Sequence, residues 1–211
     1  MKKNYVQYGC RLAAPREWTN FDISPTLIIQ KTPIIGKILK SKLKTSFPSN
    51  VQYGDIIKGL PIEENSCDGL FCSHTLEHLS LQDFRKALRN SFKVLKKGGI
   101  FRCILPDLEI FARSYIEDLD KGDNLASLNF INNTLLGIKE KPKGIIGFFS
   151  SFIGTSNHLW MWDSKSLSEE LRAVGFTEIR VCKFNDSQDE MFKYVEDIDR
   201  FNDAFAIESI K

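Results

Sequence analysis

Residues 68–105, DGLFCSHTLEHLSLQDFRKALRNSFKVLKKGGIFRCIL, decide the fold class. The runs 68–73 and 100–105 are apolar and have the length of buried strands. Between them, Ser80 followed three residues later by Asp83 is typical of a capped helix start. This helix is expected to bury one stripe of apolar side chains, namely Leu81, Phe84, Leu88 and Leu95. The pattern therefore predicts a strand, a helix and a second strand in succession.

The same alternation of strands and helices extends outward in both directions. The helix that begins at Ser80 is expected to end at Gly98, because glycine tolerates the left-handed stop, while Lys96 and Lys97 suit the negative end of the helix dipole. Further strands are predicted at 5–8, 18–21, 51–53, 176–183 and 204–210, and further helices at 33–44, 107–119, 124–136 and 164–174. In the helix 107–119, the side chains expected to point inward are Leu108, Phe111, Tyr115 and Leu119. We therefore predict an α/β fold with a mostly parallel sheet and helices on its faces.

Length and composition exclude several classes of protein. The 211 residues suit one ordinary domain, and 29 Lys and Arg against 27 Asp and Glu give no general electrostatic case for nucleic-acid binding. Residues 1–9 lack the apolar core of a secretory signal, and the longest apolar stretch, 145–153, has about half the length that a bilayer requires. Five cysteines without a CxxC spacing argue against a disulfide framework or a zinc knuckle, so a reducing, cytoplasmic setting is expected.

Two insertions are expected within the domain. The segment between Asp22 and Asp55 contains five lysines and no acidic residue, which predicts a basic helical insertion near 31–46. Its lysines would form a solvated face, and a weak contact with an acidic membrane surface is the alternative. A helical or lid insertion is expected near 123–160. Its apolar stretch would be a packed lid by default, with a dimer contact or a membrane-touching element as alternatives.

The residues that directly follow the predicted strands are expected to carry the chemistry, because ligands of open parallel sheets bind beyond the carboxyl ends of the strands. These positions combine a glycine, several carboxylates and a histidine, in the groups Gly9-Cys10-Arg11, Asp22, Asp55, Ser73-His74 and Pro106-Asp107. Carboxylates accept hydrogen bonds from ribose hydroxyls, and glycine lets the backbone pass close to a ligand. The set therefore suits a nucleoside.

Six stretches, taken in order, resemble class I S-adenosylmethionine-dependent methyltransferases of a small, type 11-like branch. They are QYGC (7–10), WTNFDISP (18–25), YGDI (53–56), LPIEENSCDGLFCSHTLEHL (60–79), VLKKGGIFRCILPDLE (94–109) and HLWMWDSKSLSEELRAVGF (158–176). The resemblance implies a single methyltransferase domain over residues 1–211, with S-adenosylmethionine as cofactor. It also implies a Rossmann-like three-layer sandwich, whose mostly parallel seven-stranded sheet has an antiparallel last strand.

The resemblance implies a cofactor role for each matching position. Gly9 and Cys10 would lie along the methionine part of the cofactor, and Asp22 would accept the ribose hydroxyls. Asp55, with the backbone of Ile56, would hold the adenine.

Ser73 and His74 would line the sulfonium end of the cofactor, while His78 and Asp107 would border the acceptor pocket. An acceptor hydroxyl or amine must lose a proton, and the candidate bases are His74, His78, Asp107 and His158. A histidine is favoured because imidazole titrates close to neutral pH.

Each assignment has a structural alternative. Asp22 and Asp55 could shape turns or caps, and His158 lies in an aromatic stretch that could be plain core. Glu77 and His78 could support the loop and cap the following helix.

No metal is expected, because His74 and His78 need a third ligand in reach and do not form an HExxH motif. Arg11 occupies the place of the family's usual second glycine. A positive φ there would cost about 1–2 kcal/mol. The Arg11 side chain could fill cofactor space or pair with the methionine carboxylate.

The sequence thus predicts a methyltransferase that acts on a small molecule or a sugar or polysaccharide precursor by in-line transfer. Arg11 motivates the alternative of a non-catalytic binding or partner module with the same fold. A nicotinamide-dependent oxidoreductase is not expected, because Gly9 stands alone where that class needs three spaced glycines. Nucleic-acid methylation is not expected either, because the chain is nearly neutral. The sequence does not predict an oligomeric state.

Overall fold

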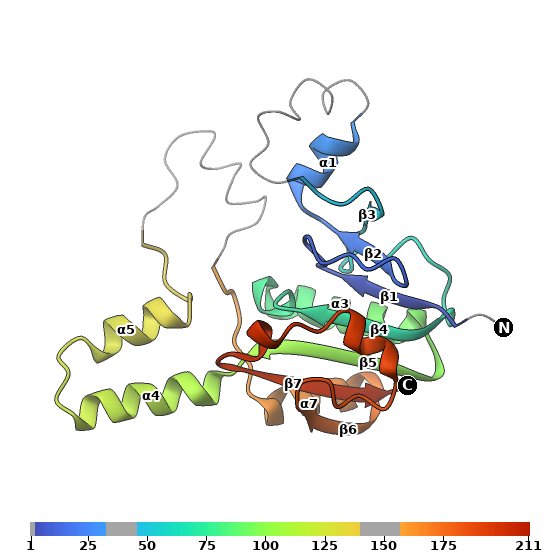
Figure 1. Cartoon of the computed structure of the whole chain (residues 1–211). Coiled ribbons are helices and arrows are strands. Elements are labelled where there is room, and N and C mark those ends of the chain that lie inside the picture. The colour runs from blue at the N-terminus through green and yellow to red at the C-terminus, as the bar shows by residue number, and fades with distance from the viewer. Residues whose placement is uncertain (1–2, 33–45, 140–156) are drawn as a thin grey trace.

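The computed structural model describes residues 3–32, 46–139 and 157–211. Its strands are β1 (Tyr5–Tyr8), β2 (Thr19–Asp22), β3 (Val51–Tyr53), β4 (Cys67–Ser73), β5 (Leu95–Pro106), β6 (Thr177–Cys182) and β7 (Ala204–Ile210). They form one sheet in the order β3-β2-β1-β4-β5-β7-β6 (Figure 1). β7 runs antiparallel to β5 and β6, and the other pairs are parallel. This confirms the mostly parallel seven-stranded sheet with an antiparallel last strand.

The helices begin and end at recognisable signals. They are α1 (Pro25–Lys31), α3 (Leu81–Val94), α4 (Leu108–Asp120), α5 (Ala126–Asn133) and α7 (Ser164–Val174), with short 3₁₀ helices η1 (Leu76–His78), η2 (Glu190–Tyr194) and η3 (Ile198–Phe201). Ser80 caps α3 by accepting the N–H of Asp83 at 3.3 Å. Asp163 and Ser166 form a capping box at α7, which ends at Gly175 with a φ of +114°.

The sheet separates two apolar clusters, and β5 shows the alternation that produces them. Phe101, Cys103 and Leu105 point into the larger cluster, which includes Phe84 of α3 and Leu167 of α7. Side chains of successive strand residues point to opposite faces, so Ile104 lies in the smaller cluster on the other face. Helices α3 and α7 thus cover one face.

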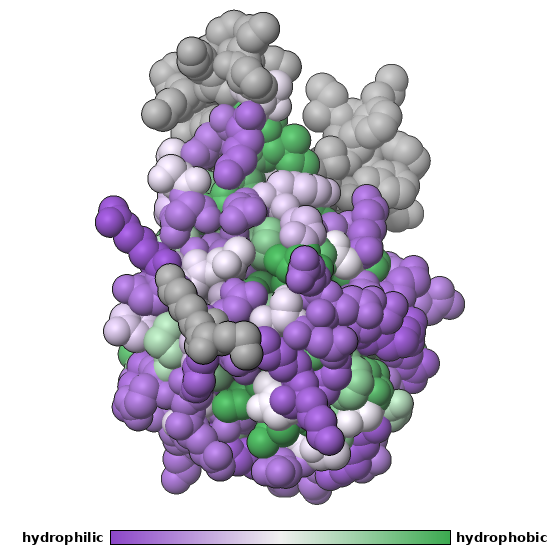
Figure 2. Space-filling model, turned by 90° about the vertical axis from the view of Figure 1, so that its right-hand side faces the viewer, coloured by the Kyte–Doolittle hydropathy of each residue, from purple (hydrophilic) through white to green (hydrophobic). Residues whose placement is uncertain are grey.

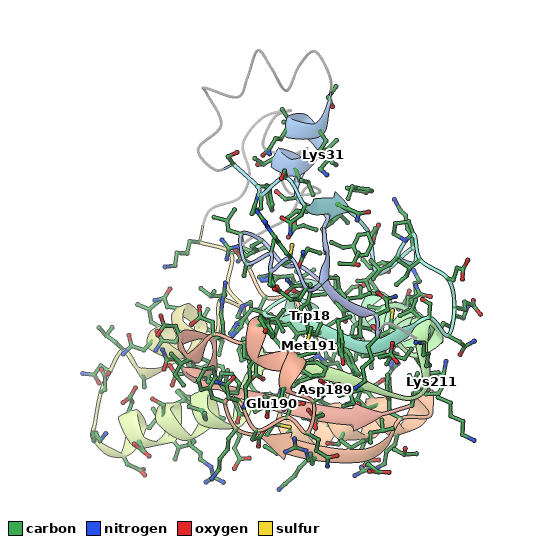
Figure 3. All side chains as sticks on the ribbon, turned by 45° about the vertical axis from the view of Figure 1, so that its right-hand side comes forward. Trp18, Lys31, Asp189, Glu190, Met191 and Lys211 are labelled. Carbon is green, nitrogen blue, oxygen red and sulfur yellow. The ribbon has the colours of Figure 1, made fainter. Side chains whose placement is uncertain are left out.

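The opposite face is covered by η2 and by the loop that precedes β2. Trp18 donates its Nε1–H to the backbone carbonyl of Met191 at 3.1 Å, and Figure 3 shows these two residues beside each other. The Trp18 ring also lies 5.3 Å from the ring of Phe192, in an edge-on arrangement. On the face that Figure 2 shows, the surface of the described residues is mainly hydrophilic, with scattered apolar patches.

A buried arginine joins the acidic C-terminal region to the sheet. Arg102 of β5 is fully buried and pairs with Glu196, with Glu208 at 3.2 Å and with Asp186 at 3.1 Å. Arg180 of β6 shares two of these partners, Glu208 at 2.7 Å and Asp186 at 3.1 Å. The network offsets the cost of burying these charges.

The predicted end of the helix after Ser80 was wrong. Helix α3 ends at Val94, and residues 95–99 belong to β5. Gly98 has the expected positive φ of +79°, but its N–H bonds to the carbonyl of Lys211 at 2.8 Å, and the N–H of Lys211 bonds to Gly99 at 3.1 Å. Sheet pairing with β7 therefore prevails over the local helix signal.

The inward stripe predicted for α4 was also wrong. Helix α4 has no buried residue, and Leu119 is 48% exposed. It packs instead against α5, with the rings of Tyr115 and Phe130 at 5.5 Å, and the two helices form an arm beside the sheet (Figure 1). Helix α5 ends at Asn133, three residues before the predicted end.

Two predicted segments lie outside the residues that the structure describes. The helix expected at 33–44 and the apolar stretch 145–153 both lie there, so the basic insertion, the lid and the membrane contact remain predictions. Helix α1, which precedes the first of these segments, was not predicted. None of the helices in the described part of the chain is long and apolar enough to cross a membrane.

Candidate functional site

The carboxyl ends of β1, β2 and β3 are tied together by backbone hydrogen bonds. The N–H of Cys10 donates to Phe21 at 3.2 Å, and the N–H of Gly54 donates to Asp22 at 3.1 Å. These bonds place the loop after β1, the end of β2 and the turn after β3 at one edge of the sheet. The three cofactor groups predicted from these strands therefore share that edge.

Asp22 organises the loop after β1. The residue is 5% exposed, and the two oxygens of its carboxylate accept the N–H groups of Arg11 at 2.9 Å and Ser24 at 2.7 Å. The first bond stabilises the positive φ of +49° at Arg11, so the backbone strain expected there is present. The Arg11 side chain is exposed rather than buried within the loop. The structural role considered for Asp22 is thus observed, and each oxygen keeps a second lone pair for a ligand.

Glycine at position 9 is required by both conformation and space. Its φ is +65°, and a Cβ there would lie 2.1 Å from Oγ1 of Thr75. The neighbouring Cys10 points into a small apolar cluster with Leu27 and Val51. Burial, helped by the charge of Asp22, raises the pKa of the Cys10 thiol to about 12. Only the backbone of Cys10 is therefore suited to contact a ligand.

Asp55 shapes the turn after β3. One of its oxygens accepts the N–H of Ile57 at 2.9 Å, and the other lies 3.6 Å from the ammonium of Lys58. The side chain of Ile56 is buried in the main core, and its carbonyl accepts a hydrogen bond from Asn90 at 2.8 Å. The adenine role of Asp55 and Ile56 stays a prediction beside this observed turn.

The end of β4 carries a buried hydroxyl and a strained histidine. Oγ of Ser73 is buried and has no hydrogen-bond partner among the described residues. His74 has a φ of +47°, its Nε2 lies 2.9 Å from the carbonyl of Arg200, and its Nδ1 lies 3.5 Å from Oε1 of Glu77. Burial lowers the pKa of His74 below its ordinary value.

All three histidines of the chain gather around Glu77. Besides His74, Nε2 of His78 lies 3.9 Å from Oε1 of Glu77, and the ring centroids of His78 and His158 are 5.1 Å apart. His158 reaches this position because the N–H groups of Leu159 and Trp160 both donate to the backbone carbonyl of Glu77, at 2.8 and 3.1 Å. The structure therefore assembles three of the four predicted bases.

Burial strongly shifts the pKa values of the buried groups in this cluster. The Glu77 side chain is 1% exposed, and burial raises its pKa to about 8. N–H groups of Thr75 and of Glu77 itself face the carboxylate and oppose that shift in part. Neither oxygen has a hydrogen-bond partner of ordinary geometry within the described ranges. Burial, together with the nearby His78, lowers the pKa of His158 to about 4. His158 is therefore a neutral imidazole at neutral pH.

Two sequence interpretations need revision here. Glu77 does not cap the following helix, a role that Ser80 fills, and sequence reasoning missed it as the buried centre of the cluster. The His-x-x-Glu-His spacing at 74–78 is the signal that could have identified it. Asp107, the fourth predicted base, caps α4 by accepting the N–H of Glu109 at 2.9 Å. Burial raises the pKa of Asp107, and the charges that act on it are those of Glu109 and Asp163.

The comparisons with known proteins point to one family of enzymes. A family described as "Methyltransferase domain" matches residues 5–103, which carry β1 to β4 and most of β5. Just under half of the chain therefore matches a methyltransferase domain, and this match supports a class I S-adenosylmethionine-dependent methyltransferase. The same findings support S-adenosylmethionine as the cofactor. No curated protein sequence matches the chain.

Solved structures show the same fold at low sequence identity. An S-adenosylmethionine-dependent methyltransferase of Thermotoga maritima, titled a possible histamine N-methyltransferase, is 15% identical with a TM-score of 0.51, over 100% of this chain and 83% of that one. A methyltransferase of Archaeoglobus fulgidus is 16% identical with the same TM-score, over 99% and 86%. Human N-acetylserotonin methyltransferase, solved with S-adenosylmethionine, is 17% identical with a TM-score of 0.51, over 98% and 47%.

Proposed function

We propose that this methyltransferase methylates an oxygen or nitrogen atom of a small molecule, or of a sugar or polysaccharide precursor. The observation that carries the proposal is the histidine cluster directly after β4, next to the strand ends where the family resemblance puts the cofactor. Five free cysteines, all buried, agree with the proposed cytoplasmic setting.

The residues at the sheet edge fit S-adenosylmethionine chemically. The cofactor supplies a methyl group on a positively charged sulfur. The carboxylates of Asp22 and Asp55 are acceptors suited to the ribose hydroxyls and the adenine, and each has a lone pair beyond its observed backbone bond. The remaining proposed cofactor contacts come from the backbone of Gly9, Cys10 and Ile56 and from the side chains of Ser73 and His74.

The histidines define the proposed acceptor side. An in-line displacement needs the acceptor atom aligned with the sulfur–methyl bond, and such alignment can contribute about 7–11 kcal/mol. A base for the acceptor proton adds about 10²–10⁴-fold. His78 is the preferred base, because its side chain is 34% exposed against 22% for His74, and an acceptor can reach it more readily. His158 would flank the acceptor, and Asp107 is the weaker candidate because its carboxylate caps α4.

The non-catalytic alternative rested on Arg11, whose side chain could have filled cofactor space. That side chain is exposed, and the backbone N–H of Arg11 donates to the carboxylate of Asp22. The exposed position of the side chain supports the catalytic proposal over the non-catalytic module.

Cofactor binding tests the assignment of Asp22. Calorimetry with S-adenosylhomocysteine would compare the wild type with Asp22→Asn and Asp22→Ala. Loss of a charge-assisted hydrogen bond is worth about 1.5–3 kcal/mol, so the alanine variant should bind about 10- to 150-fold more weakly. Asparagine keeps one acceptor oxygen and should lose less. The control is Asp120→Asn, an exposed carboxylate on α4. Unchanged affinity in both Asp22 variants would refute the ribose assignment.

Incorporation of labelled methyl groups tests the acceptor class. A metabolite extract supplied with labelled S-adenosylmethionine should yield a labelled small molecule or saccharide. The variant His78→Asn should slow labelling while leaving S-adenosylhomocysteine affinity unchanged, because His78 is proposed to act on the acceptor alone. Labelling only of nucleic acid or protein would contradict the proposal.

A further inference from the structure

The cluster around Glu77 has the composition of a metal site. Glu77, His78 and His158 each offer one ligand atom, and these atoms lie within 4.8 Å of one another. His74 adds a fourth, since its Nδ1 is 3.5 Å from Oε1 of Glu77. Three imidazoles and one carboxylate are ligands that zinc and neighbouring transition metals prefer. The missing third ligand, which made a metal unexpected from the sequence, is thus supplied by the fold.

The burial of Glu77 is a second observation that points to a ligand. The side chain is 1% exposed, and its oxygens have no ordinary hydrogen-bond partner in the described part of the chain. Nδ1 of His158, which is also buried, has none either. Buried carboxylates are normally paired, hydrogen-bonded or bound to a metal. Besides the backbone N–H groups that face it, the Glu77 carboxylate has imidazole nitrogens of His74 and His78 at 3.5 and 3.9 Å from Oε1.

The outer contacts of the histidines direct their lone pairs into the cluster. Nδ1 of His78 lies 3.1 Å from the carbonyl of Asn157, and Nε2 of His74 lies 2.9 Å from the carbonyl of Arg200. A carbonyl only accepts, so these nitrogens must carry hydrogen, and the opposite nitrogen of each neutral ring keeps the lone pair. In both rings that opposite nitrogen is the one nearest Glu77. Metal-binding histidines are oriented in this way by backbone carbonyls.

We propose that Glu77, His78 and His158 bind one divalent transition-metal ion, with Zn²⁺ as the first choice and His74 as the fourth ligand. Zinc ligands lie about 2.0–2.2 Å from the ion, so any two of them stand at most about 4.4 Å apart. For Glu77, His78 and His158, binding therefore needs only a small contraction, because their ligand atoms already lie within 4.8 Å of one another. The H-x-x-E-H spacing at 74–78 is that of one class of zinc enzymes, although here it lies on a strand end and η1. With the ion bound, His78 would be a ligand instead of the base, and the ion would hold and acidify an acceptor oxygen beside the methyl donor. This use of the ion rests on the proposed function, whereas the binding itself does not.

Metal binding to the full chain without an affinity tag tests the proposal, because the three histidines are the only ones in the sequence. After dialysis against a chelator, Zn²⁺ would be titrated in competition with a chromogenic chelator, and Co²⁺ would report its ligands by its visible spectrum. The wild type is expected to bind one ion per chain. His78→Asn and Glu77→Gln are expected to bind at least about 10-fold more weakly, because even outer contacts of metal ligands contribute about 10–100-fold.

The control is Glu117→Gln, an exposed carboxylate of α4 that should bind as the wild type does. Circular dichroism and S-adenosylhomocysteine affinity would confirm that each variant is folded. Absence of stoichiometric binding by the wild type, equal binding by the variants, or a cobalt–thiolate band from the cysteines would each overturn the proposal. If the wild type binds metal but not S-adenosylhomocysteine, the proposed function is refuted. If it binds S-adenosylhomocysteine but no metal, the metal site alone is refuted.

Discussion

Replacing Gly9 by alanine should destabilise the protein for two separable reasons. The residue has a φ of +65°, and a left-handed backbone costs an ordinary residue about 1–2 kcal/mol. Its new Cβ would also meet Oγ1 of Thr75 at 2.1 Å, and overpacking of this kind typically costs about 1–3 kcal/mol. The free energy of unfolding should therefore fall by about 2–5 kcal/mol in Gly9→Ala.

The second contribution depends on Thr75 and can be removed. Thr75→Ala alone should cost about 0.5–1.5 kcal/mol, because Oγ1 donates to the carbonyl of Ser73 at 3.1 Å. In the double variant with Gly9→Ala, the closest contact of the new Cβ becomes the Cβ of residue 75 at 3.1 Å, which a small shift relieves. The double variant should therefore be more stable than the sum of the single effects predicts.

Urea denaturation of the four proteins in this double-mutant cycle measures the coupling. A favourable coupling of about 1–3 kcal/mol is expected from the relieved overlap. Additive effects within about 0.3–0.5 kcal/mol would refute the packing account of Gly9. S-adenosylhomocysteine affinity measured on the same proteins then separates packing from ligand approach, because a cofactor role predicts weak binding even in the stabilised double variant.

Three further predictions concern stability and thiol reactivity. Arg102→Met should destabilise the protein by about 3–5 kcal/mol in urea denaturation, because it leaves buried carboxylates without their cation; a loss below about 1 kcal/mol would contradict this. Ser80→Ala should cost about 1 kcal/mol through loss of the α3 cap, again measured by denaturation, and no change would contradict the capping role. Burial raises the pKa of the Cys10 and Cys182 thiols to about 12, so both should resist alkylation in the folded protein and react only after unfolding or as the pH approaches that value. Mass spectrometry would measure the labelling, and fast labelling of the native protein at pH 8 would contradict the burial.

Local patterns predicted the sheet and the main helices correctly where local and long-range preferences agree. The Ser80 cap and the alternating residues of β5 are examples, since both signals lie within a few neighbouring residues. The helix end at Gly98 was misread because its hydrogen-bond partner, Lys211, lies more than a hundred residues away in the chain. The stripe on α4 was misread for a related reason, since apolar spacing does not distinguish a core from a neighbouring helix such as α5.

For the candidate site too, local rules predicted some positions correctly, whereas contacts between residues distant in sequence were missed. The strand-end rule brought Gly9, Asp22 and Asp55 to one edge, because it depends only on sheet topology. The histidine cluster was not predicted as a unit, because His158 joins it through backbone bonds to Glu77 across 80 residues of chain, and no spacing in the sequence records such a contact.

The backbone carbonyl of Glu77 accepts the N–H groups of Leu159 and Trp160, while the side chain of the same residue faces the histidines. These two sets of contacts use different atoms, so a substitution of the side chain leaves the backbone hydrogen bonds in place. Substitutions at position 77 would consequently change the charge and the ligand type at the histidine cluster while the backbone bonds to Leu159 and Trp160 stay in place, so this position is well suited to engineering the chemistry of the cluster.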